Sequence, residues 1–237
     1  MIPNRKKWFI FVVLTTIVVT RLPVSASEAR LPPLAKNAVI LAFGDSLTFG
    51  TGAVPGESYP AVLERLVGRR VVNEGIPGET TGEGLARLPE VLRREKPALL
   101  ILCHGANDLL QGLSRRQAAD NLKAMVRLAR EKGAGVVLIA VPLLGIILSP
   151  DPLQLEITTE KGAVYHIEVP SPGISLSPAP FYREIGMEMG IPVEEKALTA
   201  ILSNGTLLSD PIHPNAAGYR RLAESIADLL KRSGAVK

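Results

Sequence analysis

The sequence predicts an α/β fold in which helices cover both faces of a mainly parallel β-sheet. Three apolar runs, at residues 39–43, 98–102 and 135–141, have the length and composition of buried strands. Segments with the periodicity of amphipathic helices lie between these runs, and strands that alternate with helices favour a parallel sheet. A chain of 237 residues is long enough for one such domain with a sizeable core.

Further signals complete the order of elements. Residues 70–73 form a weaker strand between the first two apolar runs. The clearest helix covers residues 114–132, with Ser114 as its N-cap and Gly133 at its C-terminal end. In parallel sheets, ligands bind beyond the carboxyl ends of the strands. Functional groups are therefore expected in the segments that begin at these ends, which start at Gly44, Gly75, His104 and Pro142.

A repeated segment interrupts the alternation of strands and helices. Residues 141–152 and 169–180 are identical at eight of twelve positions. Between the copies, apolar and polar residues alternate over 153–157 and again over 165–169, with a turn at 160–162, which predicts a β-hairpin. We interpret this as a duplication that inserted about 28 residues, near 149–176, into an otherwise complete domain. The hairpin is either a surface feature or a lid over the site.

The first 26 residues have the three parts of a secretory signal peptide. Residues 5–7 (Arg-Lys-Lys) form the charged start, and residues 8–19 are an apolar run too short for an ordinary membrane span. Residues 24–26 are small enough to suit cleavage. We therefore predict a signal peptide at 1–26, one domain at 27–237, and export to the periplasm or the cell exterior. The other interpretation is an uncleaved anchor that lies on a membrane surface.

The charge distribution argues against nucleic-acid binding. Four of the 27 lysines and arginines lie in the first 26 residues, which hold no acid, and the other 23 balance the 23 acidic residues. The predicted domain is therefore neutral and presents no basic face for nucleic acid. Aromatic residues make up only 4% of the chain, too few for a base-stacking surface. Cys103 is the single cysteine, so no disulfide forms within the chain.

A serine follows the first predicted strand directly, in the sequence Gly-Asp-Ser-Leu-Thr-Phe-Gly at 44–50. At a strand-to-helix turn the hydroxyl of Ser46 would be exposed at the carboxyl edge of the sheet, and its own N–H would be ready to stabilise an oxyanion. The other interpretation is a serine that only caps the helix. The spacing differs from the Gly-x-Ser-x-Gly turn of α/β-hydrolases, so that family is disfavoured.

An aspartate and a histidine lie three residues apart near the end of the chain, in Ser-Asp-Pro-Ile-His-Pro-Asn at 209–215. One turn can bring the Asp210 carboxylate to the Nδ1 atom of His213, which leaves Nε2 free to take a proton from a serine. The other interpretation is an ordinary surface loop. The chain has three histidines and none has a partner at metal-ligand spacing, so we expect no metal site and no cofactor.

Three motifs in this order resemble the SGNH/GDSL hydrolase family: Gly-Asp-Ser-Leu at 44–47, Gly-Ala-Asn-Asp at 105–108 and Asp-x-x-His-Pro-Asn at 210–215. The likeness is strongest to bacterial periplasmic esterases with thioesterase and lysophospholipase activity, and it extends from about Val39 to Leu230. It implies a three-layer α/β/α sandwich with a mainly parallel five-stranded sheet, the flavodoxin-like arrangement of that family. The implied enzyme is a serine esterase that hydrolyses acyl esters, thioesters or lysophospholipids.

The resemblance also implies roles for individual residues. Ser46 matches the family's nucleophile, and His213 and Asp210 complete its catalytic set. The oxyanion hole would combine the backbone N–H groups of Ser46 and Gly78 with the side-chain amide of Asn107.

Other residues near these motifs are assigned structural roles. Gly75 competes with Gly78 for the oxyanion position, but the residues that follow fit Gly78 better. His104 departs from the small residue expected before Gly105, and we interpret it as structural. Asp45 and Asp108 are expected to brace their loops.

Two other functions remain open at this level. One is a polysaccharide O-acetyl esterase of the cell envelope, although the only tryptophan, Trp8, lies in the signal segment, which leaves no indole platform for sugars. The other is a non-catalytic envelope protein that kept the fold. The expected partner is an ester or lipid substrate, with peripheral contact to a membrane.

Overall fold

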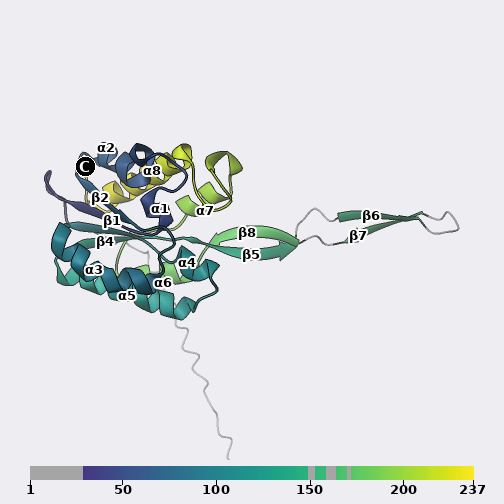
Figure 1. Ribbon diagram of the computed structural model, residues 1–237, viewed down its shortest axis with the longest axis horizontal. Coiled ribbons are helices and arrows are strands. Elements are labelled where there is room, and N and C mark those ends of the chain that lie inside the picture. Colours follow the sequence, from purple (N-terminus) through teal and green to yellow (C-terminus); the bar gives the residue numbers. More distant parts are fainter. Residues whose placement is uncertain (1–28, 149–152, 159–163, 170–171) are drawn as a thin grey trace, which may run out of the picture.

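The computed structural model describes residues 29–148, 153–158, 164–169 and 172–237. Its centre is a five-stranded, fully parallel sheet with the strand order β2-β1-β3-β4-β9 (Figure 1). The strands are β1 (Ile40–Gly44), β2 (Val71–Gly75), β3 (Leu99–Cys103), β4 (Gly135–Ile139) and β9 (Val193–Glu194). The predicted parallel sheet is confirmed.

Helices cover both faces of this sheet. Helices α2 and α8 pack against each other on one face, and α3, α5 and α6 form the layer on the other (Figure 1). The helices are α1 (Ser46–Phe49), α2 (Tyr59–Val67), α3 (Thr81–Glu95), α4 (Ala106–Leu110), α5 (Arg115–Glu131), α6 (Pro180–Met189), α7 (Ala197–Leu202) and α8 (Ala216–Arg232). Short 3₁₀ turns lie at Pro55–Glu57 and Gly205–Leu207. The predicted three-layer α/β/α fold is therefore confirmed.

The core forms where the central strands meet the apolar faces of the helices. Every residue of β1 and β3 is buried, which explains why both strands are continuous apolar runs. Helix α5 has the ends predicted for it: the Ser114 side chain accepts a hydrogen bond from the N–H of Gln117, and Gly133 follows the helix with a φ of 81°.

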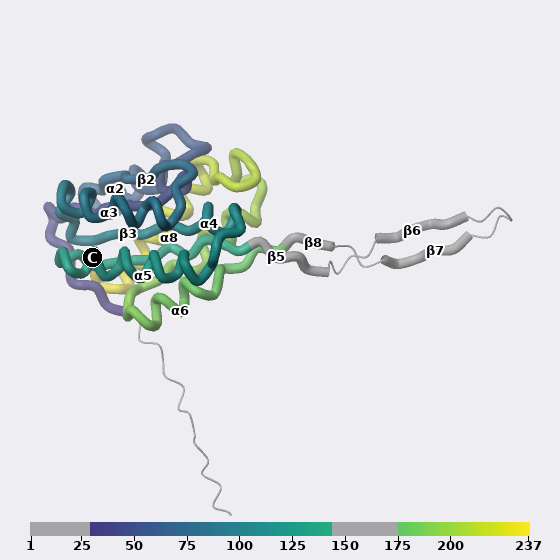
Figure 2. Tube along the Cα trace, turned by 60° about the horizontal axis from the view of Figure 1, so that its bottom comes forward, coloured from purple at the N-terminus to yellow at the C-terminus, as the bar shows by residue number. Residues whose placement is uncertain are grey.

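The repeated segments form an arm outside the central sheet (Figures 1 and 2). Strand β5 (Pro142–Leu148) pairs antiparallel with β8 (Pro172–Pro178), so the two copies of the repeat pair with each other. Beyond them β6 (Leu153–Thr158) pairs antiparallel with β7 (Val164–Val169), which confirms the predicted hairpin. The arm begins at Pro142, ahead of the expected boundary near 149, because the first copy also forms a strand.

Two predicted features fall on residues that the structure does not describe. The signal peptide at residues 1–26 and the turn at residues 160–162 lie outside the described residues. Within the described residues, no helix is both long and apolar enough to span a bilayer.

Candidate active site

Ser46 is the first residue of helix α1, immediately beyond the carboxyl end of β1. The N-cap of this helix is Asp45, whose carboxylate accepts a hydrogen bond from the N–H of Leu47 at 3.0 Å. The capping role therefore belongs to Asp45, and the Ser46 hydroxyl is left for another partner. Its Oγ atom lies 3.0 Å from Nε2 of His213, which is 167 residues away in the chain.

His213 and Asp210 form the single turn that their spacing predicts. Nδ1 of His213 lies 2.7 Å from Oδ2 of Asp210. The other carboxylate oxygen, Oδ1, accepts the backbone N–H groups of Ile212 and His213, each at 2.9 Å. The carboxylate therefore binds both the imidazole and the backbone of the turn, which fixes the ring with Nε2 toward Ser46.

The same contacts keep Asp210 ionised. Partial burial alone would raise the pKa of this carboxyl group, but the hydrogen bonds from the Ile212 backbone and the His213 side chain outweigh it and lower the pKa below 3.8. Because the folded pKa lies below the unfolded one, the contribution of this group to stability is complete above the unfolded pKa. It is lost as the pH falls through the folded value.

Asn215 anchors the turn that carries the histidine. Its Oδ1 atom accepts the N–H of Gly218 and so caps α8, while its Nδ2 group donates to the carbonyl groups of Thr206 and Leu208. The Asp-x-x-His-Pro-Asn motif contains this asparagine, but its capping role was not predicted. An asparagine directly before a long amphipathic helix is the sequence signal for such an N-cap.

The three predicted oxyanion donors lie around one cavity. Ser46, Gly78 and Asn107 all line it, together with His213. Gly78 has a φ of 82°, in the left-handed region, and lies in the turn between β2 and α3. Among the described residues, neither the N–H of Ser46 nor that of Gly78 has an acceptor. Both donors are therefore free to bind an oxygen atom of a substrate.

Asn107 is oriented by a second hydrogen bond. Its Nδ2 group donates to the backbone carbonyl of Glu79 at 2.9 Å. An amide NH₂ group has two hydrogens, so one fixes the plane of the amide and the other remains for the cavity that Asn107 lines. Gly75, the competing glycine, is the last residue of β2, and its N–H already donates to Oδ1 of Asn73. The structure therefore favours Gly78.

The cavity is large and mostly apolar. Its volume is about 830 Å³. Its apolar walls come from helices, from the segment that follows β4 and from the base of the arm, and include Leu47, Leu109, Val141, Leu143, Leu176 and Leu202. Among the described residues that line it, Arg115 carries the one permanent charge.

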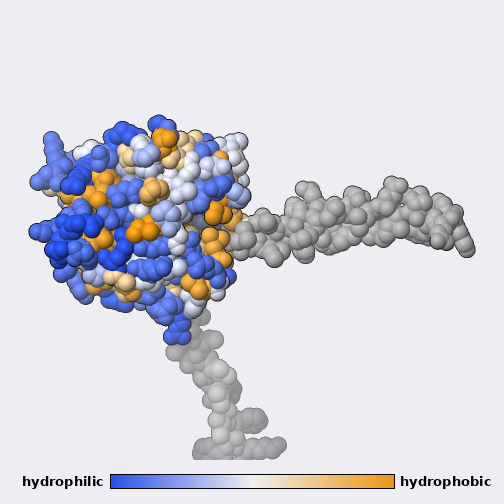
Figure 3. Space-filling view, viewed as in Figure 1, coloured by the Kyte–Doolittle hydropathy of each residue, from blue (hydrophilic) through white to orange (hydrophobic). Residues whose placement is uncertain are grey.

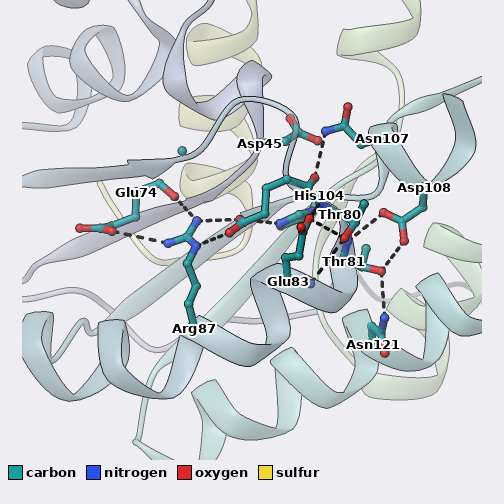
Figure 4. Close-up of polar contacts among 12 residues, drawn as sticks. Asp45, Glu74, Thr80, Thr81, Glu83, Arg87, His104, Asn107, Asp108 and Asn121 are labelled. Carbon is teal, nitrogen blue, oxygen red and sulfur yellow. Dashed lines mark hydrogen bonds and ion pairs between the residues drawn. The ribbon is translucent and has the colours of Figure 1, made fainter. Parts of the chain in front are cut away.

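The acidic residues beside the motifs brace their loops, as expected. Asp108 is buried and accepts hydrogen bonds from the N–H of Thr81 at 2.8 Å and from its hydroxyl at 2.6 Å, which ties α4 to the start of α3 (Figure 4). Burial raises the pKa of Asp45 to about 6, although nearby His104 acts in the opposite direction. His104 is itself fully buried and does not line the cavity. Across the described ranges, no group of three or more His, Cys, Asp or Glu residues could hold a metal ion.

Comparison with known proteins identifies the family of the chain. The GDSL-like Lipase/Acylhydrolase family matches residues 42–167. Esterase TesA of Pseudomonas aeruginosa is 34% identical over 200 residues, which cover 81% of this chain and 87% of that protein. The chain belongs to the GDSL-like lipase/acylhydrolase family. It is therefore an ester-hydrolysing enzyme of the serine hydrolase type, as the sequence predicts.

Other relatives have the same fold or carry related names. The thioesterase 1/protease 1/lysophospholipase L1 of Escherichia coli is 31% identical over 106 residues, which are 44% of this chain and 51% of that protein. The crystal structure of TesA superimposes with a TM-score of 0.62 at 25% identity, and the match covers 82% of this chain and 99% of that one. The predicted fold and family are both confirmed.

Replacing Asp210 with asparagine tests the orientation of His213. The NH₂ group of the asparagine cannot accept a hydrogen bond from Nδ1–H of His213. The imidazole would therefore favour the tautomer with its proton on Nε2, which cannot take the proton of Ser46. We expect kcat on a short ester to fall by roughly 10³- to 10⁴-fold, with little change in the melting temperature. The control is D228N, an exposed acid on α8 that pairs only with Lys231 among the described residues, and it should leave kcat unchanged. Near-normal turnover by D210N would show that His213 does not depend on this carboxylate.

Proposed function

We propose that Ser46, His213 and Asp210 hydrolyse esters through an acyl-enzyme. The observation that carries this proposal is the 3.0 Å contact between Ser46 Oγ and His213 Nε2, at the wall of an apolar cavity. His213 takes the hydroxyl proton as Ser46 attacks the substrate carbonyl, and it then protonates the leaving group. Water activated by the same imidazole releases the acid and restores the serine.

The oxyanion of each tetrahedral intermediate is stabilised by three donors. These are the N–H groups of Ser46 and Gly78 and the second Nδ2 hydrogen of Asn107, all of which border the cavity. The donors are held before the substrate arrives, so little reorganisation is needed when charge develops. Removing one such donor typically costs about 3 kcal/mol of barrier, or roughly a hundredfold in rate.

The shape and lining of the cavity favour substrates with an apolar acyl chain. A volume of about 830 Å³ exceeds what an acetyl group needs, and the mostly aliphatic lining provides few polar partners for sugar hydroxyls. The relative in E. coli is named as a thioesterase and lysophospholipase, which supports acyl esters or thioesters as the substrate class. A polysaccharide O-acetyl esterase is less well supported by this lining.

Arg115 favours a leaving group that carries a negative charge. The residue begins α5, lines the cavity and makes no ion pair or hydrogen bond with another described residue through its guanidinium group. Because the other lining side chains favour an aliphatic chain, we assign the guanidinium to the alcohol or thiol side of the substrate. The phosphate of a lysophospholipid has the required chemistry.

The surface near the cavity mouth favours contact with a lipid surface. Figure 3 shows apolar side chains beside the base of the arm, where Leu143 and Leu176 border the cavity. Several large apolar side chains on the loops and short helices of this edge are exposed: Phe49, Ile76, Leu110, Leu113 and Ile212. We propose that they touch the lipid assembly from which the substrate is drawn.

The proposed location follows from the sequence pattern of residues 1–26. A charged start, a short apolar run and small residues near 24–26 support export. We propose that the mature enzyme acts in the periplasm or outside the cell.

The first test is hydrolysis of p-nitrophenyl esters, from acetate to palmitate, by the wild type and by S46A. The variant should lose at least about 10⁴-fold in kcat with an unchanged melting temperature, because only the nucleophilic oxygen is removed. The wild type should prefer chains longer than acetyl. Turnover that persists in S46A would refute the assignment, and a sharp preference for acetate would favour the O-acetyl esterase.

The proposed role of Arg115 is tested with two esters that share an acyl chain. One has 3-hydroxybenzoate as its leaving group and the other has the neutral methyl ester of that acid. R115Q should lower kcat/KM about tenfold on the anionic ester only, which corresponds to the loss of one charge-assisted hydrogen bond. The neighbouring R116Q is the matched control, since Arg116 does not line the cavity. Equal effects of the two variants would contradict a specific subsite.

The lipid-surface contact is tested with two aspartate variants. L113D should reduce binding to phosphatidylcholine–phosphatidylglycerol vesicles about tenfold or more, because burying a leucine in lipid contributes roughly 2 kcal/mol. L66D is the control: Leu66 and Leu113 are both 46% exposed, but Leu66 lies on α2, away from the cavity lining. Both variants should hydrolyse a soluble short ester normally. Vesicle binding that does not distinguish them would overturn the proposal, and concentration-dependent self-association lost in L113D would point to a second copy instead.

A further inference from the structure

Behind the oxyanion hole lies a buried ionic cluster that the proposed mechanism does not use. Its centre is Glu79, which directly follows Gly78 and is only 6% exposed. Arg87 of α3 donates to both carboxylate oxygens of Glu79, from Nε at 2.5 Å and from a terminal nitrogen at 2.8 Å. Nε2 of His104 lies 3.0 Å from the same carboxylate. Arg87 and His104 point toward each other in Figure 4, and the Glu79 carboxylate joins them.

The cluster keeps Glu79 charged although it is buried. Burial alone would raise the pKa of this carboxyl group, but the hydrogen bonds from His104 and Arg87 overcome it and lower the pKa. Arg87 is held in turn by the backbone carbonyl of Glu74 at 2.8 Å and by the ring of Phe43, whose centroid lies 4.0 Å from its guanidinium carbon. A buried carboxylate with several fixed partners has little freedom to move.

The backbone of Glu79 connects this cluster to the active site. Its carbonyl oxygen accepts the Asn107 side-chain amide at 2.9 Å, the bond that fixes the plane of that amide. Its N–H donates to the carbonyl of Ile76 at 3.2 Å, which closes the turn around Gly78. Glu79 is therefore held both at its carboxylate and at its N–H, on either side of the carbonyl to which Asn107 is bound.

His104 is accommodated by a small residue opposite it. A Cβ atom on Gly84 of α3 would lie 2.4 Å from Nε2 of His104, so only glycine leaves room for this ring. The backbone carbonyl of His104 accepts a hydrogen bond from the Tyr182 hydroxyl at 2.7 Å, which holds the chain just after the end of β3. With the Glu79 carboxylate as acceptor, Nε2 carries the proton, and Nδ1 has no hydrogen-bond partner within the described residues. Within the part of the chain that the structure describes, the contact with Glu79 is thus the one hydrogen bond of this ring.

We propose that Glu79 is a positioning residue for the oxyanion hole, which acts through Asn107 and depends on Arg87 and His104 to hold its carboxylate. The proposal rests on the esterase mechanism above. Glu79 does not touch the substrate. It sets the direction of the second Nδ2 hydrogen of Asn107, which binds the oxyanion more strongly than the neutral carbonyl of the substrate, so kcat should depend on it more than KM.

The test is E79Q, with kcat expressed per active site titrated by a serine-directed phosphonate. The amide preserves the shape, but its NH₂ group cannot accept a hydrogen bond from Arg87 or His104. At least one of the three bonds to the carboxylate is therefore lost, and the carbonyl that holds Asn107 should shift. We expect kcat per titrated site to fall about 10- to 100-fold and KM to change less than about twofold. An unchanged kcat per titrated site, even with a lower melting temperature, would overturn the proposal.

Two comparisons separate positioning from general stability. E83A removes a neighbouring glutamate that caps α3 through Thr80, so it should lower the melting temperature while kcat per titrated site stays normal. H104Q, whose amide can still donate to Glu79, should retain more activity than H104L. Equal kcat values for H104Q and H104L would contradict the role given to His104.

A double-mutant cycle with N107A tests the route of the effect. If Glu79 acts through Asn107, E79Q should change kcat little in the N107A background. Fully additive losses would overturn the proposal. Failure of the underlying mechanism is distinguishable, because the wild type would then not react with the phosphonate at all.

Discussion

The register of β1 with its two neighbours is the constraint on which the site depends. Gly44, the last residue of β1, is paired with Gly75 of β2 on one side and with Cys103 of β3 on the other. The three strands therefore end at the same level, and the segments that carry the nucleophile and the two further oxyanion donors begin side by side. A Cβ atom at position 44 would lie 1.9 Å from the Cys103 carbonyl oxygen, so glycine is required for this close approach.

The nucleophile and the base of the site are held in different ways. Ser46 lies between a fully buried strand and a capped helical turn, so its position is tied to the core. His213 lies on a loop, but the bonds around Asp210 and Asn215 replace the missing regular structure. The nucleophile and the base are therefore both held in position before a substrate binds.

Features of the site that depend on residues close together in the sequence could be predicted. Ser46 after an apolar strand, and Asp210 three residues before His213, both follow from short-range geometry, and the structure brings them together. The two-residue strand β9 has no signal of its own, because it exists only through pairing with β4. The bond between Asn107 and Glu79 joins residues 28 positions apart, and no periodicity reports such a contact. The pairing of the two repeated segments with each other could not be predicted either, because their many proline and serine residues are not typical of strands.

That pairing has a symmetry of its own. In the stem of the arm, Ile146 lies opposite Ile174, which is the equivalent residue of the other copy. A local two-fold axis therefore passes through this pair, as in an antiparallel dimer of identical strands. A duplicated segment of this kind supplies its own hydrogen-bonding partner, so it can be added to a parallel sheet without opening an edge or shifting a register in the host. The central sheet thus keeps a continuous parallel strand order, and the arm begins at the wall of the cavity.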